Sequence, residues 1–147
     1  MKRLALIAVL AAVAFAAEAQ MKPEDVVKQR RSAYAVIGYN FSSLGAMAQE
    51  KKPYSKDEAM RNAQLVAALA DYPKGFFADG THGVADSKAK PEIWQKRADF
   101  DSKMDKMITE TKKLPQAARA DLPALKKAVS DAGAACKACH DDYRAKS

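Results

Sequence analysis

Apolar residues recur at the three- and four-residue spacing of an amphipathic helix over four stretches of the chain. Each stretch opens with a helix start signal, which is a proline beside acidic residues, a Ser-x-x-Glu capping box, or an aspartate close to a proline. The predicted helices begin at Pro23, Ser55, Pro91 and Asp121, and they end at Lys51, at Pro73, at Pro115 and close to the C-terminus. Two short links and one long one between four helices predict an all-α fold, an antiparallel four-helix bundle.

The apolar positions within each predicted helix identify the candidate core. The first helix has a seven-residue repeat with two further positions inside it: Val27, Tyr34, Phe41 and Ala48, with Ile37 and Leu44. The second helix contributes mostly small residues: Ala59, Ala63, Val66 and Ala70. The third contributes Ile93, Phe100, Met104, Met107, Thr111 and Leu114. One apolar stripe per helix fits the predicted four-helix bundle.

Residues 74–90 lack this periodicity. They contain Gly75, Gly80 and Gly83, together with Thr81. We therefore expect a long loop between the second and third helices. A loop of this length is unusual in a compact domain and is often functional.

The first nineteen residues have the pattern of a secretory signal peptide. Two basic residues precede an apolar run at positions 4–17, and an Ala-x-Ala cleavage site ends at Ala19. The run is too short to span a bilayer, which takes about 20 residues. We expect residues 1–19 to be removed, and residues 20–147 to form one domain that is exported to the periplasm and is not held in the membrane.

Composition and charge exclude several classes of protein. Hydrophobic residues make up 48% of the chain and aromatic residues 7%, a balance that disfavours both disorder and an all-β sandwich. The net charge is +7, but Lys and Arg are scattered among Asp and Glu. Because no basic stripe is interleaved with aromatic residues, we expect no nucleic-acid interface.

The two cysteines of the chain, Cys136 and Cys139, belong to the sequence Cys-Lys-Ala-Cys-His, which ends at His140. In an exported protein, C-x-x-C-H is the attachment motif of a c-type haem. Cysteines three residues apart lie on one face of a helix, so both sulfurs can form thioethers with one porphyrin edge. The adjacent histidine can then bind the iron. We expect one covalently attached haem c per chain, with His140 as its metal ligand.

Three other interpretations of the motif fit less well. A zinc site normally needs four ligands, and His82 is the one remaining Cys or His, far away in the predicted loop. A thioredoxin-like redox pair requires strands, which the pattern does not predict. A structural disulfide suits an exported protein but gives the histidine no role.

The fourth helix places the motif toward the interior. Its apolar positions follow alternating spacings of three and four: Leu122, Leu125, Val129, Ala132, Cys136, Cys139 and Tyr143. Such a seam faces the other helices of a bundle. We therefore expect the haem inside the bundle near the C-terminal helix, with small residues beside it at Ala134 and Ala135.

The chain resembles the cytochrome c′ family, the high-spin class II c-type cytochromes. The motif lies near the C-terminus, on the last helix, as in that family. The resemblance rests on residues 22–25, Arg30, residues 91–94 and residues 136–144. It implies a periplasmic haem protein, commonly a homodimer, with five-coordinate iron and a buried open face. It also implies binding of the small gases nitric oxide and carbon monoxide.

The resemblance assigns roles on the proximal side of the haem. Cys136 and Cys139 correspond to the thioether cysteines, and His140 corresponds to the proximal iron ligand. Arg144 corresponds to a basic residue close to that histidine. Helical spacing also places residue 144 one turn beyond residue 140.

Two residues of the first helix correspond to the family's contacts on the other side. Tyr34 aligns with the residue that covers the open iron face. Arg30, one turn earlier, aligns with an arginine that contacts a haem propionate, and a buried arginine requires an anionic partner. Arg31 falls where many relatives have glutamine, and we assign it no haem contact.

Three functions remain in view. The first is a gas-binding or electron-transferring haem protein that is not an enzyme, with a redox partner protein as a further interaction. The alternative is a low-spin electron carrier in which Met47, Met104 or Met107 is the sixth ligand. A peroxidase would need a distal histidine paired with arginine, and His82 in a glycine-rich loop is a poor candidate.

Overall fold

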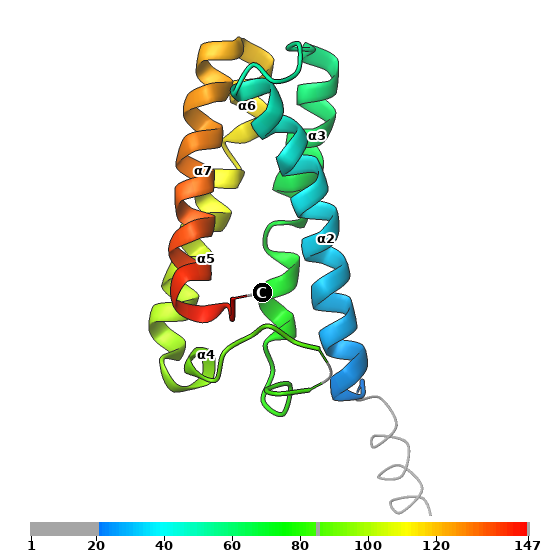
Figure 1. Cartoon of the computed structure of the whole chain (residues 1–147), viewed down its shortest axis with the longest axis vertical. Helices are drawn as coiled ribbons and strands as arrows, with labels where there is room; N and C mark the ends of the chain where they lie inside the picture. The colour runs from blue at the N-terminus through cyan, green and yellow to red at the C-terminus, as the bar shows by residue number, and fades with distance from the viewer. Residues whose placement is uncertain (1–20, 85, 147) are drawn as a thin grey trace, which may run out of the picture.

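The computed structural model describes residues 21–84 and 86–146, so the predicted signal peptide lies outside the described residues. Within these residues the elements in chain order are α2 (Pro23–Ala48), α3 (Lys56–Leu69), the short 3-10 helix η1 (Tyr72–Phe76), α4 (Glu92–Gln95), α5 (Arg97–Thr111), α6 (Leu114–Ala120) and α7 (Leu122–Tyr143). The long helices α2, α3, α5 and α7 alternate in direction around a common interior (Figure 1). The predicted all-α, antiparallel four-helix bundle is confirmed.

Local chemistry sets where the helices begin. The side chain of Ser55 accepts a hydrogen bond from the backbone N–H of Glu58, and Asp121 accepts one from Ala124 at 2.8 Å. Both caps satisfy donors that the first helical turn leaves free. Pro23 lies in the first turn of α2, where a missing N–H costs nothing. The predicted starts of α2, α3 and α7 are therefore confirmed.

The predicted third helix is wrong in two respects. Lys96 has φ −119° and ψ 47°, which interrupts the helix between α4 and α5. Pro115 lies in the first turn of α6 and so opens a further helix beyond the predicted stop. Proline is tolerated in a first turn because its missing N–H would have no partner there. The predicted stripe is still buried at each of its six positions, from Ile93 to Leu114.

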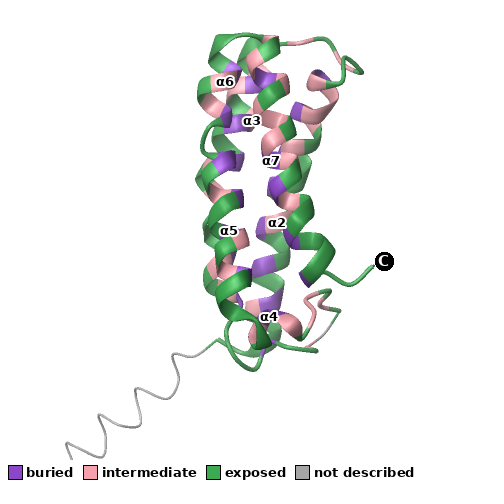
Figure 2. Cartoon of the chain, turned by 90° about the vertical axis from the view of Figure 1, so that its left-hand side faces the viewer, coloured by how far each residue is buried: buried purple, intermediate pink, exposed green. Residues whose placement is uncertain are grey.

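The buried residues form two clusters along the bundle axis, with buried positions facing the interior (Figure 2). We call the first the alanine cluster: Ile37, Leu44, Met47, Ala59, Ala63, Val66, Leu114, Ala118, Leu125 and Ala132. We call the second the cysteine cluster: Ala70, Phe77, Ile93, Phe100, Met104, Met107, Ala135, Cys139 and Tyr143. Tyr34 packs against both. The seam of α7 supplies residues to both clusters, so it faces the interior as its spacing predicts.

The buried face of α2 differs from the predicted stripe. Tyr34, Phe41 and Ala48 are only half-buried. Two polar side chains, Arg30 and Asn40, are buried on this helix. Asn40 donates to the carbonyl of Val36 at 2.8 Å, which satisfies its amide locally, so a pattern of apolar residues could not reveal it.

The segment between α3 and α4 is partly ordered. It contains η1, and beyond η1 the residues Phe77 and Thr81 are buried. Gly80 and Gly83 adopt positive φ values of 79° and 66°, which residues with a side chain rarely adopt. Farther on, Ala89 forms an isolated antiparallel bridge with Arg144. The predicted loop therefore contacts both α2 and the end of α7.

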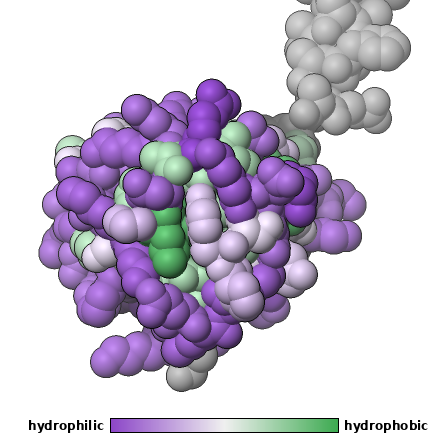
Figure 3. All heavy atoms as spheres, turned by 90° about the horizontal axis from the view of Figure 1, so that it is seen from above, coloured by the Kyte–Doolittle hydropathy of each residue, from purple (hydrophilic) through white to green (hydrophobic). Residues whose placement is uncertain are grey.

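One end of the described bundle is mostly polar. Viewed from the end where α6 lies, hydrophilic side chains surround a small apolar area (Figure 3). Within residues 21–84 and 86–146, no helix is both long and apolar enough to cross a membrane.

Burial in the alanine cluster gives a direct test of the packing. Leu44 is fully buried, whereas Leu65 is 46% exposed. We expect Leu44→Ala to lower the free energy of unfolding by about 2–5 kcal/mol, because it removes buried methyl groups and leaves a cavity. Leu65→Ala makes the same chemical change at the surface and should cost less than about 1 kcal/mol. Urea denaturation measures both, and equal losses would contradict the assigned core.

Candidate cofactor site

The two cysteines lie on one face of α7, close to its C-terminal end. Cys139 is buried in the cysteine cluster, and Cys136 is half-buried beside it. Burial raises the pKa of both thiols, that of Cys139 to about 11. Reactive cysteines of redox enzymes have lowered pKa values instead. The pair is therefore kept as neutral thiols facing the interior, unlike a thioredoxin-type site.

His140 follows on the last turn of α7 and is exposed. Partial desolvation of its ring and then the positive charge of Arg144 lower the pKa of His140. The backbone N–H of Arg144 donates to the His140 carbonyl at 3.1 Å. The lowered pKa favours the neutral imidazole, the form that binds metals. Arg144 thus lies close to His140, as helical spacing predicts.

Arg30 is a buried cation, only 3% exposed. It donates to the Phe76 carbonyl at 2.9 Å, to Ser87 Oγ at 2.8 Å and to Thr81 Oγ1 at 3.4 Å. Its guanidinium carbon lies 4.4 Å from the ring centre of Phe77. These groups are neutral, and no carboxylate in the described part of the chain pairs with Arg30. Burial accordingly lowers the pKa of Arg30, and a buried positive charge of this kind favours an anionic partner.

Tyr34 extends from α2 toward the cysteine cluster. Its hydroxyl donates to Met104 Sδ at 3.5 Å, and its ring packs edge-on against Phe77 at 6.5 Å. Burial, followed by the neighbouring Cys139, raises the pKa of Tyr34 far above its usual value. A neutral phenol in this position is a packing group and a weak iron ligand. Tyr34 and the cysteines therefore share one interior region.

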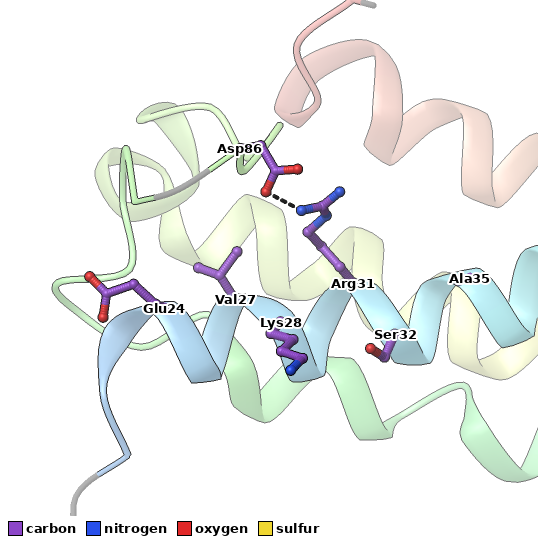
Figure 4. Close-up of a pocket in the computed structure, with 7 residues that line it drawn as sticks. All are labelled: Glu24, Val27, Lys28, Arg31, Ser32, Ala35 and Asp86. Carbon is purple, nitrogen blue, oxygen red and sulfur yellow. Dashed lines mark hydrogen bonds and ion pairs between the residues drawn. The ribbon is translucent and has the colours of Figure 1, made fainter.

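Arg31 points away from this region. It forms an ion pair with Asp86 across a shallow surface pocket that is also lined by Glu24, Lys28 and Ser32 (Figure 4). Both members of the pair are largely exposed. Exposed ion pairs contribute about 0–1 kcal/mol. This contact joins α2 to the loop without involving the interior.

The remaining candidate ligands lie elsewhere or are engaged. The exposed His82 packs edge-on against Trp94 at 5.7 Å, an environment unlike that of a distal catalytic histidine. Met47 belongs to the alanine cluster, and Met104 and Met107 belong to the cysteine cluster. Among residues 21–84 and 86–146, no group of three or more His, Cys, Asp or Glu is arranged to hold a metal ion. The zinc interpretation has no ligand set there.

Sequence reasoning missed several residues that complete the site. Thr81 and Ser87 reach Arg30 from the loop, and Asp99 accepts a hydrogen bond from the Tyr143 hydroxyl. The loop has no hydrophobic periodicity. In the sequence, Asp99 cannot be told apart from other acidic residues on exposed faces of helices. The sequence signal for a shaped loop is the pair Gly80 and Gly83, which adopt positive φ values in the structure.

The residues present fit a covalently bound haem. Two neutral thiols lie on one helical face, a neutral imidazole follows them, and a buried arginine on the facing helix has no carboxylate partner among the described residues. Aromatic and methionine side chains surround the cysteines. This donor set offers two thioether positions, one axial nitrogen and one site for a propionate. The fold and these residues are those expected of a haem-binding helical bundle.

Comparison with known proteins gives the family. The family model described as "Cytochrome C'" matches residues 25–144. Cytochrome c′ of Rubrivivax gelatinosus is 36% identical over 126 residues, covering 85% of this chain and 98% of the relative. Cytochrome c′ of Alcaligenes xylosoxydans xylosoxydans is 38% identical over 126 residues, covering 85% and 97%. The chain belongs to the cytochrome c′ family.

Solved structures agree with this assignment. Cytochrome c′ from Rubrivivax gelatinosus superposes with a TM-score of 0.81 at 36% identity, covering 84% of this chain and 98% of that one. The protein from Shewanella frigidimarina gives 0.82 at 37% identity, covering 86% and 99%. A nitric oxide complex of a variant from Alcaligenes xylosoxidans gives 0.80 at 37% identity, covering 87% and 99%. The family consists of haem proteins rather than enzymes, which confirms the expected class.

Proposed function

We propose that this protein is a periplasmic cytochrome c′ that holds one covalent haem c and binds small diatomic gases at the iron. The observation that carries the proposal is the placement of Cys136 and Cys139 on the interior face of α7, directly before His140. The nitric oxide complex of a related cytochrome c′ supports the choice of ligand. The leader-like residues 1–19 support export.

The residues of this chain have different roles on the two sides of the proposed haem. On the proximal side, Cys136 and Cys139 would anchor the cofactor and His140 would supply a nitrogen to the iron. Desolvation, followed by the charge of Arg144, lowers the pKa of that imidazole. When bound, the haem supplies an iron that can take a diatomic gas or an electron. Arg30 would neutralise a propionate in a region where a free carboxylate is costly.

On the opposite side, Tyr34 excludes water and stronger ligands. Its ring is packed against Phe77, and its hydroxyl is engaged with Met104. A neutral phenol with a raised pKa is a poor donor to ferrous iron. We infer that the iron stays five-coordinate and high-spin until a small gas displaces the ring.

A methionine-ligated electron carrier is the second candidate. Met104 favours it, because this thioether is buried in the same cluster as Cys139 and next to Tyr34. The Tyr34 hydroxyl donates a hydrogen bond to the Met104 sulfur. This contact engages the thioether and therefore favours the gas-binding function. A redox partner protein is compatible with either function.

Covalent attachment is the first prediction. Purified wild-type protein should have the mass of residues 20–147 plus one haem, and acid–acetone should fail to extract the colour, because two thioether bonds hold the group. Cys136→Ser together with Cys139→Ser should release it. Extractable haem, or bound zinc without a haem absorption band, would contradict the assigned site.

Replacement of Tyr34 tests the covered face. Tyr34→Ala should speed carbon monoxide binding, because it removes the ring that a gas must displace. It should also lower the free energy of unfolding by about 2–4 kcal/mol, since a packed side chain is lost. Arg144→Ala is the matched change on the proximal side, and it should alter ligand release without speeding entry. Stopped-flow mixing with carbon monoxide measures both rates, and an unchanged entry rate in Tyr34→Ala would remove its assigned role.

The homodimer is a prediction about the neighbouring helices α2 and α3. Their exposed apolar residues include Val36, Tyr39 and Leu65, and Tyr39 is 81% exposed. A self-complementary apolar patch is typical of two-fold dimers. Tyr39→Lys should weaken association at least about tenfold by placing a charge in the interface, and Tyr72→Lys, at an exposed tyrosine outside these helices, should not. Analytical ultracentrifugation measures the oligomeric state of the wild type and of both variants. A wild-type monomer at micromolar concentration would contradict the dimer.

A further inference from the structure

The last turn of α7 is tied to α5 by a small polar network. The hydroxyl of Tyr143 donates to Asp99 Oδ2 at 2.5 Å, although the Tyr143 side chain is only 3% exposed. Asp99 also accepts from Lys103 Nζ at 2.5 Å, and the same ammonium lies 2.9 Å from Asp142 Oδ2. Two successive residues of α7 are therefore bound to one turn of α5.

Packing restrains the Tyr143 ring as well. The Phe100 ring lies edge-on to it at 5.4 Å, and the Lys103 ammonium lies 5.4 Å from its centre. Aromatic pairs in this geometry favour one orientation of the rings. The tyrosine therefore has a fixed ring and a fixed hydroxyl.

The backbone around Tyr143 is held from the other side. The N–H of Lys90 donates to the Tyr143 carbonyl at 3.0 Å, and the N–H of Ala145 donates to the Lys88 carbonyl at 2.8 Å. The Lys90 ammonium also donates to the carbonyl of Asp142 at 2.6 Å. The segment 88–90 and helix α5 thus hold the end of α7 between them.

His140 lies on this same turn but has no comparable support of its own. It is exposed, and within residues 21–84 and 86–146 its ring takes part in none of the hydrogen bonds. The direction of the imidazole therefore depends on the backbone that carries it. Histidines that bind metals are usually oriented by partners outside the ligand set, and the loss of such partners changes the metal's properties.

We propose that Tyr143, held by Asp99, is a positioning residue for His140: it fixes the turn of α7 that directs the imidazole toward the iron and so sets the strength of that axial bond. The inference rests on the proposed role of His140 as the iron ligand. Tyr143 lies in the cysteine cluster with Cys139 and is assigned no ligand role of its own.

The decisive variant is Tyr143→Phe, which keeps the ring and removes one hydroxyl. In the reduced haem-bearing protein, the iron–histidine stretching band in the resonance Raman spectrum should shift and broaden, because the imidazole is less firmly directed. The reduction potential should change with it, and carbon monoxide release should change by up to about tenfold.

Tyr54→Phe is the matched control. The Tyr54 hydroxyl donates to the Ala118 carbonyl at 2.8 Å, and α6, which carries Ala118, lies at the opposite end of the bundle from the C-terminal end of α7 (Figure 1). This variant should lose stability through one missing hydrogen bond while leaving the Raman band and the potential in place. The control separates positioning of the ligand from general support of the fold.

Changes at Asp99 test the partnership. Asp99→Asn keeps an oxygen that accepts from Tyr143, so its Raman band should stay near that of the wild type. Asp99→Ala should reproduce Tyr143→Phe, and the double variant should add nothing further, because the two residues act as a pair. If Tyr143→Phe carries haem but leaves the band unmoved, as Tyr54→Phe does, the positioning role is overturned. Wild-type protein without covalent haem would instead overturn the function on which it rests.

Discussion

The register of α7 is the constraint on which the structure depends. Spacings of three and four along this helix bury Leu125 and Ala132 in the alanine cluster and Cys139 and Tyr143 in the cysteine cluster. A rotation of the helix by one residue would move both cysteines, and the other apolar positions of α7, away from the interior. The cap at Asp121 sets where this register begins. The position of the site therefore follows from the packing of α7. Any substitution that weakens this packing affects both the core and the site.

The interior also contains a charge that the core alone does not explain. Arg30 is surrounded by neutral acceptors from Phe76, Thr81 and Ser87. Each acceptor comes from the segment between α3 and α4, which also reaches the end of α7 through Ala89. One segment therefore positions the proposed propionate contact and the turn that carries His140. This shared dependence explains why a long loop with few apolar residues has a defined path.

Most of the fold could be predicted from periodicity, because helices that bury one face leave a repeating apolar signal. The predictions failed where that signal does not exist. The break at Lys96 and the extra helix at Leu114–Ala120 depend on backbone angles and on the tolerance of Pro115 in a first turn. Cys136, Cys139 and His140 could be proposed as the haem-attachment motif from their spacing. Thr81, Ser87 and Asp99 could not, because their contacts span 44 to 57 residues along the chain.

The absorption spectrum of the purified protein, oxidised and then reduced, reports the coordination of the iron. In the proposed function, Tyr34 covers the open face of the haem with its hydroxyl held by Met104, and no strong sixth ligand reaches the iron. High-spin, five-coordinate spectra are expected in both oxidation states. A low-spin, six-coordinate spectrum with a methionine–iron charge-transfer band would contradict this expectation and would make Met104 the first residue to replace.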